Sequence, residues 1–182
     1  MIAVLVFITA YTVGLTAYGV AIDSPLTYVY LGITLLLVAT FGVFHYFTRF
    51  PLSLLWLMAV VGLVNTMGGV LLADGDPLYA AGRVGPVPFD KLFHALAGLA
   101  LAFIAWHVVR RFAGDGYHRT GLVVINFLVV MGGGAVVEIA ELIGTALSDV
   151  SVGDYGNNAL DLVANALGAA VGCTWLYFKP RT

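Results

Sequence analysis

The chain has 182 residues, of which 61% are hydrophobic and only 10% are charged. Soluble domains contain roughly 45–50% apolar and about 25% charged residues, so a water-soluble fold of this length would lack the polar side chains to cover its surface. Eight basic and ten acidic residues give a net charge of -2, which excludes a basic surface for nucleic acid. The single cysteine excludes an intramolecular disulfide. The composition therefore indicates an integral membrane protein, with the lipid bilayer as its main partner and no nucleic acid.

Six apolar stretches follow one another along the chain, and each is close to the roughly 20 residues that cross a hydrocarbon layer. They are long continuous runs, which favour helices over the short alternating segments of a barrel. The expected fold class is all-α, a polytopic membrane helix bundle forming a single transmembrane domain over residues 1–182. We expect the first span to be retained rather than cleaved as a signal peptide, because no Lys or Arg precedes it. The predicted spans are residues 2–22, 26–47, 52–72, 92–109, 121–147 and 159–178.

The basic residues predict the orientation of these spans. With six spans, both termini and the second and fourth loops share one side of the membrane. Cytoplasmic loops carry an excess of Lys and Arg, so we expect the N and C termini in the cytoplasm of a protein in the plasma or inner membrane. Six of the eight basic residues fall on this side: Arg49, Arg110, Arg111, Arg119, Lys179 and Arg181.

The ionisable residues inside the last three spans share helix faces. Asp90 and His94 are four residues apart at the start of the fourth span, and Glu138 and Glu141 are three apart in the fifth. Ionisable side chains within a span are costly and usually face the bundle interior.

Polar residues in the sixth span lie at the same predicted depth. The fourth and sixth spans enter the membrane on the outer side, where the fifth leaves it. Helix rise therefore places six side chains at one level near the outer face: Asp90, His94, Glu138, Glu141, Asp161 and Asn165.

Four carboxylates and one imidazole, with no Lys or Arg expected at their depth, cannot all be ionised side by side in a low dielectric. Either some take up protons or a cation neutralises them. Acidic and His ligands on neighbouring helices build metal sites in bundles, and oxygen ligands with one His suit several divalent ions. We therefore expect a divalent metal ion of undetermined identity, with these ligands: Asp90, His94, Glu138, Glu141 and Asp161.

A bound metal polarises a phosphoryl or carbonyl group or activates water. The expected function is a hydrolase or transferase acting on a lipid or lipid-linked envelope substrate, with His94, Glu138 and Glu141 as catalytic residues. Asn165 and Asp154 are the expected substrate-binding residues. The sequence leaves open whether the protein is an enzyme. A small ion- or proton-coupled transporter and a non-catalytic membrane subunit or lipid-binding module are the alternatives.

Structural explanations compete with these roles. Asp90 alone suits an N-cap of the fourth span, and Asp161 suits a first-turn acid favoured by the helix dipole. Residues 73–91 contain Gly and Pro at spacings that forbid one continuous helix, and they form either a cover over the site or a plain linker.

The ordered set of polar residues in the C-terminal half, about residues 88–172, resembles the YjdF-like and VanZ-like bacterial and archaeal membrane proteins. The resemblance implies a polytopic membrane protein with an acidic site at the cell envelope, and it implies no reaction. Asn157 departs from the Asp of YjdF-like proteins, and Asn165 is closer to the VanZ-like pattern. The matching residues are Asp90, His94, Glu138, Glu141, Gly153, Asp154, Asn157, Asp161, Asn165 and Gly168.

Overall fold

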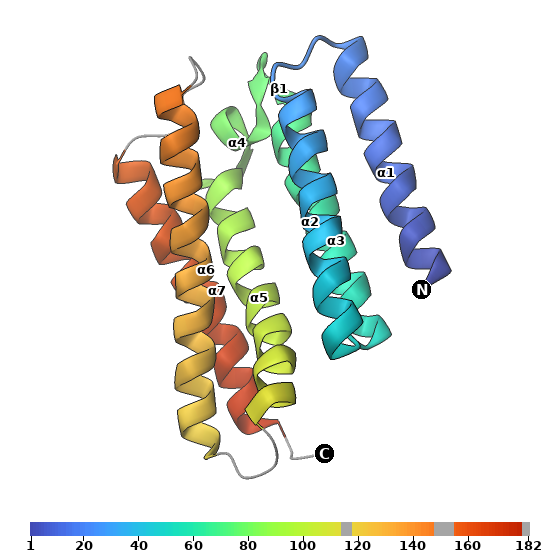
Figure 1. Cartoon of the computed structure of the whole chain (residues 1–182). Coiled ribbons are helices and arrows are strands. Elements are labelled where there is room, and N and C mark those ends of the chain that lie inside the picture. Colours follow the sequence, from blue (N-terminus) through green and yellow to red (C-terminus); the bar gives the residue numbers. More distant parts are fainter. Residues whose placement is uncertain (114–117, 148–154, 180–182) are drawn as a thin grey trace. The chain divides into compact units, whose positions relative to one another are not determined.

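The computed structural model describes residues 1–113, 118–147 and 155–179 (Figure 1). The chain divides into two compact units, Met1–Phe93 and His94–Thr182, which we describe one at a time. The division falls inside helix α5 (Phe89–Ala113), so the first turn of that helix is counted with the first unit although the helix continues unbroken.

Three long helices make up most of the first unit: α1 (Ile2–Ala21), α2 (Thr27–Thr48) and α3 (Leu52–Val70). The breaks between them follow from local chemistry. Asp23 adopts a left-handed φ of 52° after α1, and Arg49 adopts a φ of 54° where α2 ends. Pro51 then precedes the first residue of α3, where its fixed φ and missing N–H cost nothing. The predicted spans thus end where the sequence breakers stand.

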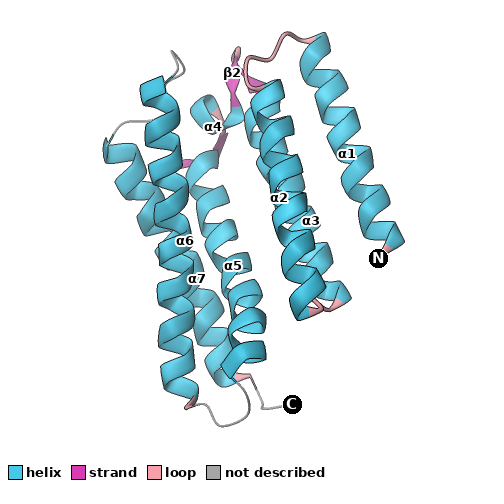
Figure 2. Ribbon diagram, in the orientation of Figure 1, coloured by secondary structure: helices cyan, strands magenta, loops and turns pink. Residues whose placement is uncertain are grey.

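A short irregular segment follows α3, and Figure 2 shows its strands in magenta. Strands β1 (Leu72–Ala73) and β2 (Asp76–Pro77) form one antiparallel hairpin, and β3 (Arg83–Val84) and β4 (Val87–Pro88) form a second. The four-residue helix α4 (Leu78–Ala81) lies between them in sequence. Asp74 and Gly75 both have positive φ, as a type I′ hairpin turn requires, and Gly85 has positive φ at the first position of the second turn. The expectation that residues 73–91 are not one helix is confirmed.

The second unit contains α5 from His94 onward, α6 (Arg119–Leu147) and α7 (Tyr155–Phe178), which lie side by side (Figure 1). On α6, a buried residue recurs at every fourth position, so the buried residues form one stripe along the helix. Val130 on this face belongs to an apolar core cluster with Ala102 of α5 and with Ala169 and Cys173 of α7. The buried stripe on α6 consists of Leu122, Asn126, Val130, Gly134 and Glu138.

Glycines let α5 and α7 approach at backbone distance. A Cβ at Gly168 would lie 2.8 Å from the carbonyl carbon of Ala95 and 2.8 Å from the backbone nitrogen of Leu99. A Cβ at Gly98 would lie 3.0 Å from the carbonyl carbon of Asn165. Small residues at such contacts are the usual means of close helix packing in membranes, and here they bring polar residues of α5 and α7 close together.

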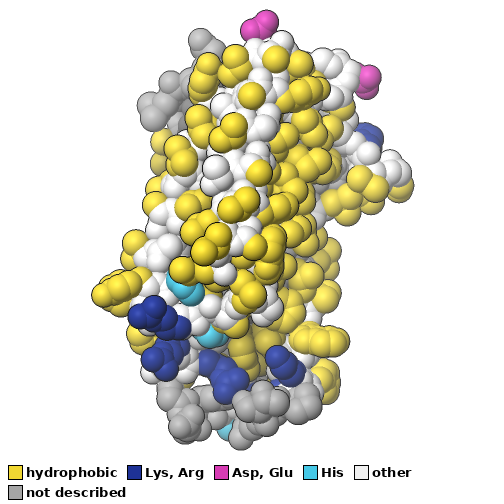
Figure 3. Space-filling model, turned by 90° about the vertical axis from the view of Figure 1, so that its right-hand side faces the viewer, with side chains coloured by type: hydrophobic (Ala, Val, Ile, Leu, Met, Phe, Trp, Pro, Cys, Tyr) yellow, Lys and Arg dark blue, Asp and Glu magenta, His cyan; other side chains and the backbone are white. Residues whose placement is uncertain are grey.

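Six helices of the described chain are long and apolar enough to cross a membrane: α1, α2, α3, α5, α6 and α7. This confirms the six predicted spans, with ends that shift by a few residues. The face drawn in Figure 3 is mostly hydrophobic along the helices, and its charged side chains gather toward the ends. The largest shifts are at α5, which runs from Phe89 to Ala113, and at α7, which begins at Tyr155. The polar residues Asp90 and Asn157 therefore lie inside helices.

Candidate metal centre

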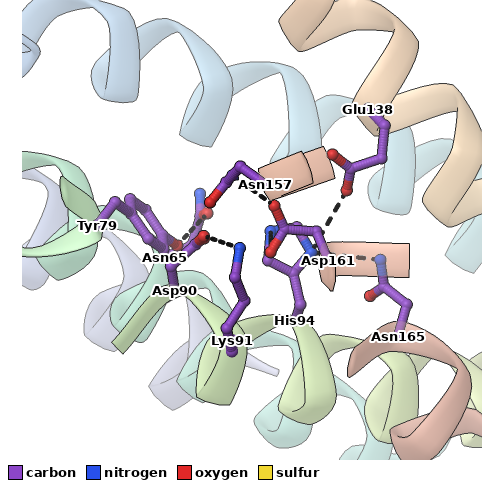
Figure 4. A network of polar contacts seen from close by, with 9 residues as sticks. All are labelled: Asn65, Tyr79, Asp90, Lys91, His94, Glu138, Asn157, Asp161 and Asn165. Atoms are coloured by element: carbon purple, nitrogen blue, oxygen red, sulfur yellow. Dashed lines mark hydrogen bonds and ion pairs between the residues drawn. The ribbon is translucent and has the colours of Figure 1, made fainter. Parts of the chain in front are cut away.

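His94 lies at the centre of a polar cluster in the second unit. It is the sixth residue of α5, about 8 Å from the start of that helix at 1.5 Å per residue. The cluster is almost closed to solvent: the exposed fractions are 6% for His94, 5% for Glu138 and 0% for Asp161. Ionisable groups this deeply buried need partners, and Figure 4 shows these side chains pointing toward one another.

The two ring nitrogens of His94 face different carboxylates. Nε2 lies 3.6 Å from Oδ1 of Asp161 on α7, and Nδ1 lies 3.6 Å from Oε1 of Glu138 on α6 (Figure 4). The side-chain amide of Asn165 lies 3.2 Å from Nδ1. All three helices of this unit therefore contribute to the surroundings of one imidazole ring.

Hydrogen bonds hold one oxygen of each nearby aspartate. Asn157 donates to Oδ2 of Asp161 at 2.7 Å, from one turn earlier on α7. Lys91 contacts Oδ2 of Asp90 at 2.8 Å, as an ion pair at the start of α5. Side chains held in this way have less freedom to turn, and restraint by a second partner is characteristic of metal ligands.

One group of three side chains has the geometry of a metal site. Asp90, His94 and Asp161 each offer one ligand atom, and these atoms all lie within 4.8 Å of one another. Asp90 precedes His94 by four residues on the same helix, so both project from one face of α5. The side chain of Asp90 is 13% exposed.

The residues fit a divalent cation by distance and by donor type. Two ligands that each lie about 2.1 Å from a zinc ion in a tetrahedral shell are about 3.4 Å apart. The 3.6 Å between Nε2 of His94 and Oδ1 of Asp161 is close to this separation, and it is longer than an ordinary hydrogen bond. Two carboxylates and one imidazole are ligands that several divalent ions accept.

Glu138 and Glu141, both expected as ligands, do not belong to this group among the described residues. Glu138 faces Nδ1, on the opposite side of the ring from the Asp161 contact. Glu141 is half-buried on α6, one turn after Glu138. The expected five-ligand set is therefore divided by the structure into a group of three and an adjacent pair of glutamates.

Three expectations need correction. Lys91 lies at the depth of the cluster and pairs with Asp90, so the expected absence of Lys and Arg there is wrong. Asp90 lies within the first turn of α5, which begins at Phe89, and it is therefore not an N-cap. Asp161 lies beyond the first turn of α7, because that helix begins at Tyr155.

Asp154, the other expected substrate-binding residue, lies outside the described residues. Sequence reasoning missed a second polar contact in this unit, at Asn126 on α6. Its amide nitrogen donates to the carbonyl oxygen of Ala102 at 3.0 Å and lies 3.4 Å from Sγ of Cys173. The signal was available, because Asn126 and Glu138 fall on the same every-fourth-residue stripe.

Comparison with known proteins places the chain in a family and goes no further. The family whose description reads "Predicted membrane protein (DUF2238)" matches residues 3–182, nearly the whole chain. No curated protein and no solved structure gave a match.

Proposed function

Since the chain belongs to this DUF2238 family of predicted membrane proteins, we propose that it is a membrane-embedded, metal-dependent enzyme with Asp90, His94 and Asp161 as the ligands. One observation carries the proposal: the ligand atoms of these three residues lie within 4.8 Å of one another, on helices apolar enough to cross a membrane.

The tautomer of His94 that its neighbours favour supports this ligand set. A carboxylate accepts hydrogen bonds, so Glu138 next to Nδ1 favours the tautomer with its hydrogen on that nitrogen. The side-chain amide of Asn165, 3.2 Å from the same nitrogen, then turns its oxygen toward the ring. The lone pair is then on Nε2, which faces Asp161. Carboxylate–histidine–metal arrangements of this kind are common around zinc. Glu138 then positions His94 and is not itself a ligand.

Charge balance supports a divalent ion. Asp90, Glu138 and Asp161 carry three negative charges when ionised, and Lys91 carries one positive charge. A divalent cation makes the sum of these groups zero, with His94 neutral. Buried charges in a low dielectric are tolerated when they are neutralised in this way. The charge of the half-buried Glu141 is not counted in this sum.

The proposed reaction is hydrolysis or group transfer on a lipid or lipid-linked envelope substrate. A bound metal would supply polarisation of a phosphoryl or carbonyl group. His94 and Glu138 are occupied in holding the site, so we assign proton transfer to Glu141, which is half-buried on the same helix. Asn165 and Asp154 remain the substrate-binding residues of the proposal, and the likeness to YjdF-like and VanZ-like envelope proteins agrees with such a substrate.

The proposal also sets the orientation. We propose that both termini are cytoplasmic, and the clustering of Lys and Arg in the loops on their side supports this. The metal centre then lies near the extracytoplasmic face of the membrane.

Metal analysis of the detergent-purified protein tests the proposal. We expect about one divalent ion per chain after incubation with Zn²⁺, Mn²⁺, Fe²⁺ or Mg²⁺ and removal of excess ion. The variants H94A and D161N should lose it. The matched control is H107A, which removes a histidine from the same helix about 20 Å away. Absence of bound ion in the unaltered protein, or retention of full metal content by H94A, would overturn the assignment.

A proton-coupled transporter is the second candidate, because His94 has a carboxylate 3.6 Å from each ring nitrogen and such a group suits proton binding. Proton-driven solute flux in proteoliposomes, abolished by E138Q and insensitive to chelator, would favour it over the enzyme.

A further inference from the structure

An apolar groove runs between α6 and α7, at the opposite end of the second unit from the metal centre. On α7, Asp161 and Tyr177 are separated by about 24 Å of helix. The groove is open on one side and has a volume of about 360 Å³. Its lining residues are Val123, Val124, Phe127, Leu128, Ala170, Cys173, Thr174, Tyr177 and Phe178. Most of these are apolar, and the helices that carry them are long and apolar enough to cross a membrane.

A cation stands at the end of this groove. The guanidinium carbon of Arg119, the first residue of α6, lies 5.8 Å from the centre of the Tyr177 ring, and Tyr177 lines the groove. One terminal nitrogen of Arg119 donates to the carbonyl oxygen of Leu176 at 2.7 Å and also contacts that of Lys179. These bonds fix the side chain at the end of α7.

Arg119 has donors left over from this role. A guanidinium carries five N–H donors, and Nε of Arg119 is buried without a hydrogen-bond partner in the described part of the chain. No described carboxylate forms an ion pair with it. The exposed Lys179 adds a second positive charge nearby. A buried donor and a cation without an ion-pair partner among the described residues, next to an apolar groove, together fit an anionic head group with an acyl tail.

We propose that this groove binds an anionic phospholipid, with an acyl chain between α6 and α7 and the phosphate on Arg119. The positive charges agree with this ligand, because anionic lipids attract basic residues at the membrane surface. The site is separate from the metal centre and does not depend on the proposed reaction.

Lipid binding to the full-length protein in detergent tests the proposal, measured by native mass spectrometry. The probes are phosphatidylglycerol and phosphatidylcholine with identical acyl chains, and glycerol 3-phosphate. We expect phosphatidylglycerol to bind about tenfold more tightly than phosphatidylcholine, as one charge-assisted contact allows. Glycerol 3-phosphate alone should not compete, because it lacks the acyl chain.

Two variants separate the head-group contact from the groove. R119Q removes the charge, and A170F fills the groove from the exposed Ala170 while leaving the bonds of Arg119 intact. Each should weaken phosphatidylglycerol binding about tenfold. The matched control is R49Q, because Arg49 also lies over a tyrosine ring, 5.9 Å from the centre of Tyr46, in the first unit. R49Q should bind as the unaltered protein does.

Equal affinity for the two lipids would overturn the proposal, and so would unchanged binding by A170F. If R119Q does not fold, A170F decides the outcome alone. A change of oligomeric state in A170F with unchanged lipid binding would assign the groove to a second copy of the chain instead.

Discussion

Replacing Gly168 by alanine tests how closely α5 and α7 must approach. The added Cβ would lie 2.8 Å from the carbonyl carbon of Ala95 and 2.8 Å from the nitrogen of Leu99, and it would also contact the carbonyl oxygen of Ala95. These are backbone atoms of a helix, so no flexible side chain can turn aside. Ordinary carbon contacts lie at about 3.5–4.0 Å, and the two helices must therefore separate by roughly 1 Å.

The separation has two measurable costs. Overpacking of this kind lowers the free energy of unfolding by about 1–3 kcal/mol. It also moves Asp161 away from His94, which lies directly before Ala95 in the sequence. The 3.6 Å between Nε2 and Oδ1 would grow to about 4.6 Å, beyond the separation of two ligands on one ion. We expect G168A to be less stable and to bind metal weakly.

The control is G133A, on α6, because a Cβ at Gly133 has nothing within 4 Å. Alanine is a better helix former than glycine by about 1 kcal/mol, so G133A should be as stable as the unaltered protein or slightly more so. Both variants are compared by unfolding in mixed SDS micelles and by metal titration. Equal behaviour of G168A and G133A in both assays would refute the close-packing argument.

Three further predictions concern single polar contacts. E138Q should weaken metal binding about 10–100-fold by removing the carboxylate next to Nδ1 of His94, and unchanged affinity in a metal titration would show that Glu138 does not position the ring. Y79F removes the 2.9 Å hydrogen bond to Asn65 and should lower the free energy of unfolding by about 1 kcal/mol, measured by SDS titration. N126A removes the contact with Ala102 and should cost about 1 kcal/mol in the same assay. In either case, a free energy of unfolding equal to that of the unaltered protein would show that the hydrogen bond does not stabilise the fold.

Hydropathy predicted six helices because lipid leaves the backbone few alternatives. Helix periodicity also predicted that Asp90, His94, Glu138, Asp161 and Asn165 would share buried faces, and the structure places the last three around the ring of His94. Helix periodicity predicts which face of a helix a residue occupies, but it does not predict the rotamer of its side chain. It therefore could not assign Asp161 and Glu138 to opposite nitrogens of His94.

Two local features were harder to predict. The predicted fourth span begins at residue 92 and so leaves Lys91 outside the membrane, whereas helix α5 already begins at Phe89. The pair neutralises itself locally, which a count of charges for each loop does not detect. Asp74-Gly75 is a typical hairpin turn sequence, but its flanking strands have only two residues each and carry no alternating pattern.

The buried stripe on α6, formed by every fourth residue, restricts how that helix can move. Asn126 and Glu138 lie three steps apart on the stripe, and each meets a polar partner on another helix. A piston-like slide by one turn, about 5.4 Å, would break both contacts at once, and a roll about the helix axis would do the same. These two polar contacts lie about 18 Å apart along α6 and hold the helix against sliding and rotation. A conformational change of the second unit should therefore come from helix bending or from side-chain rearrangement.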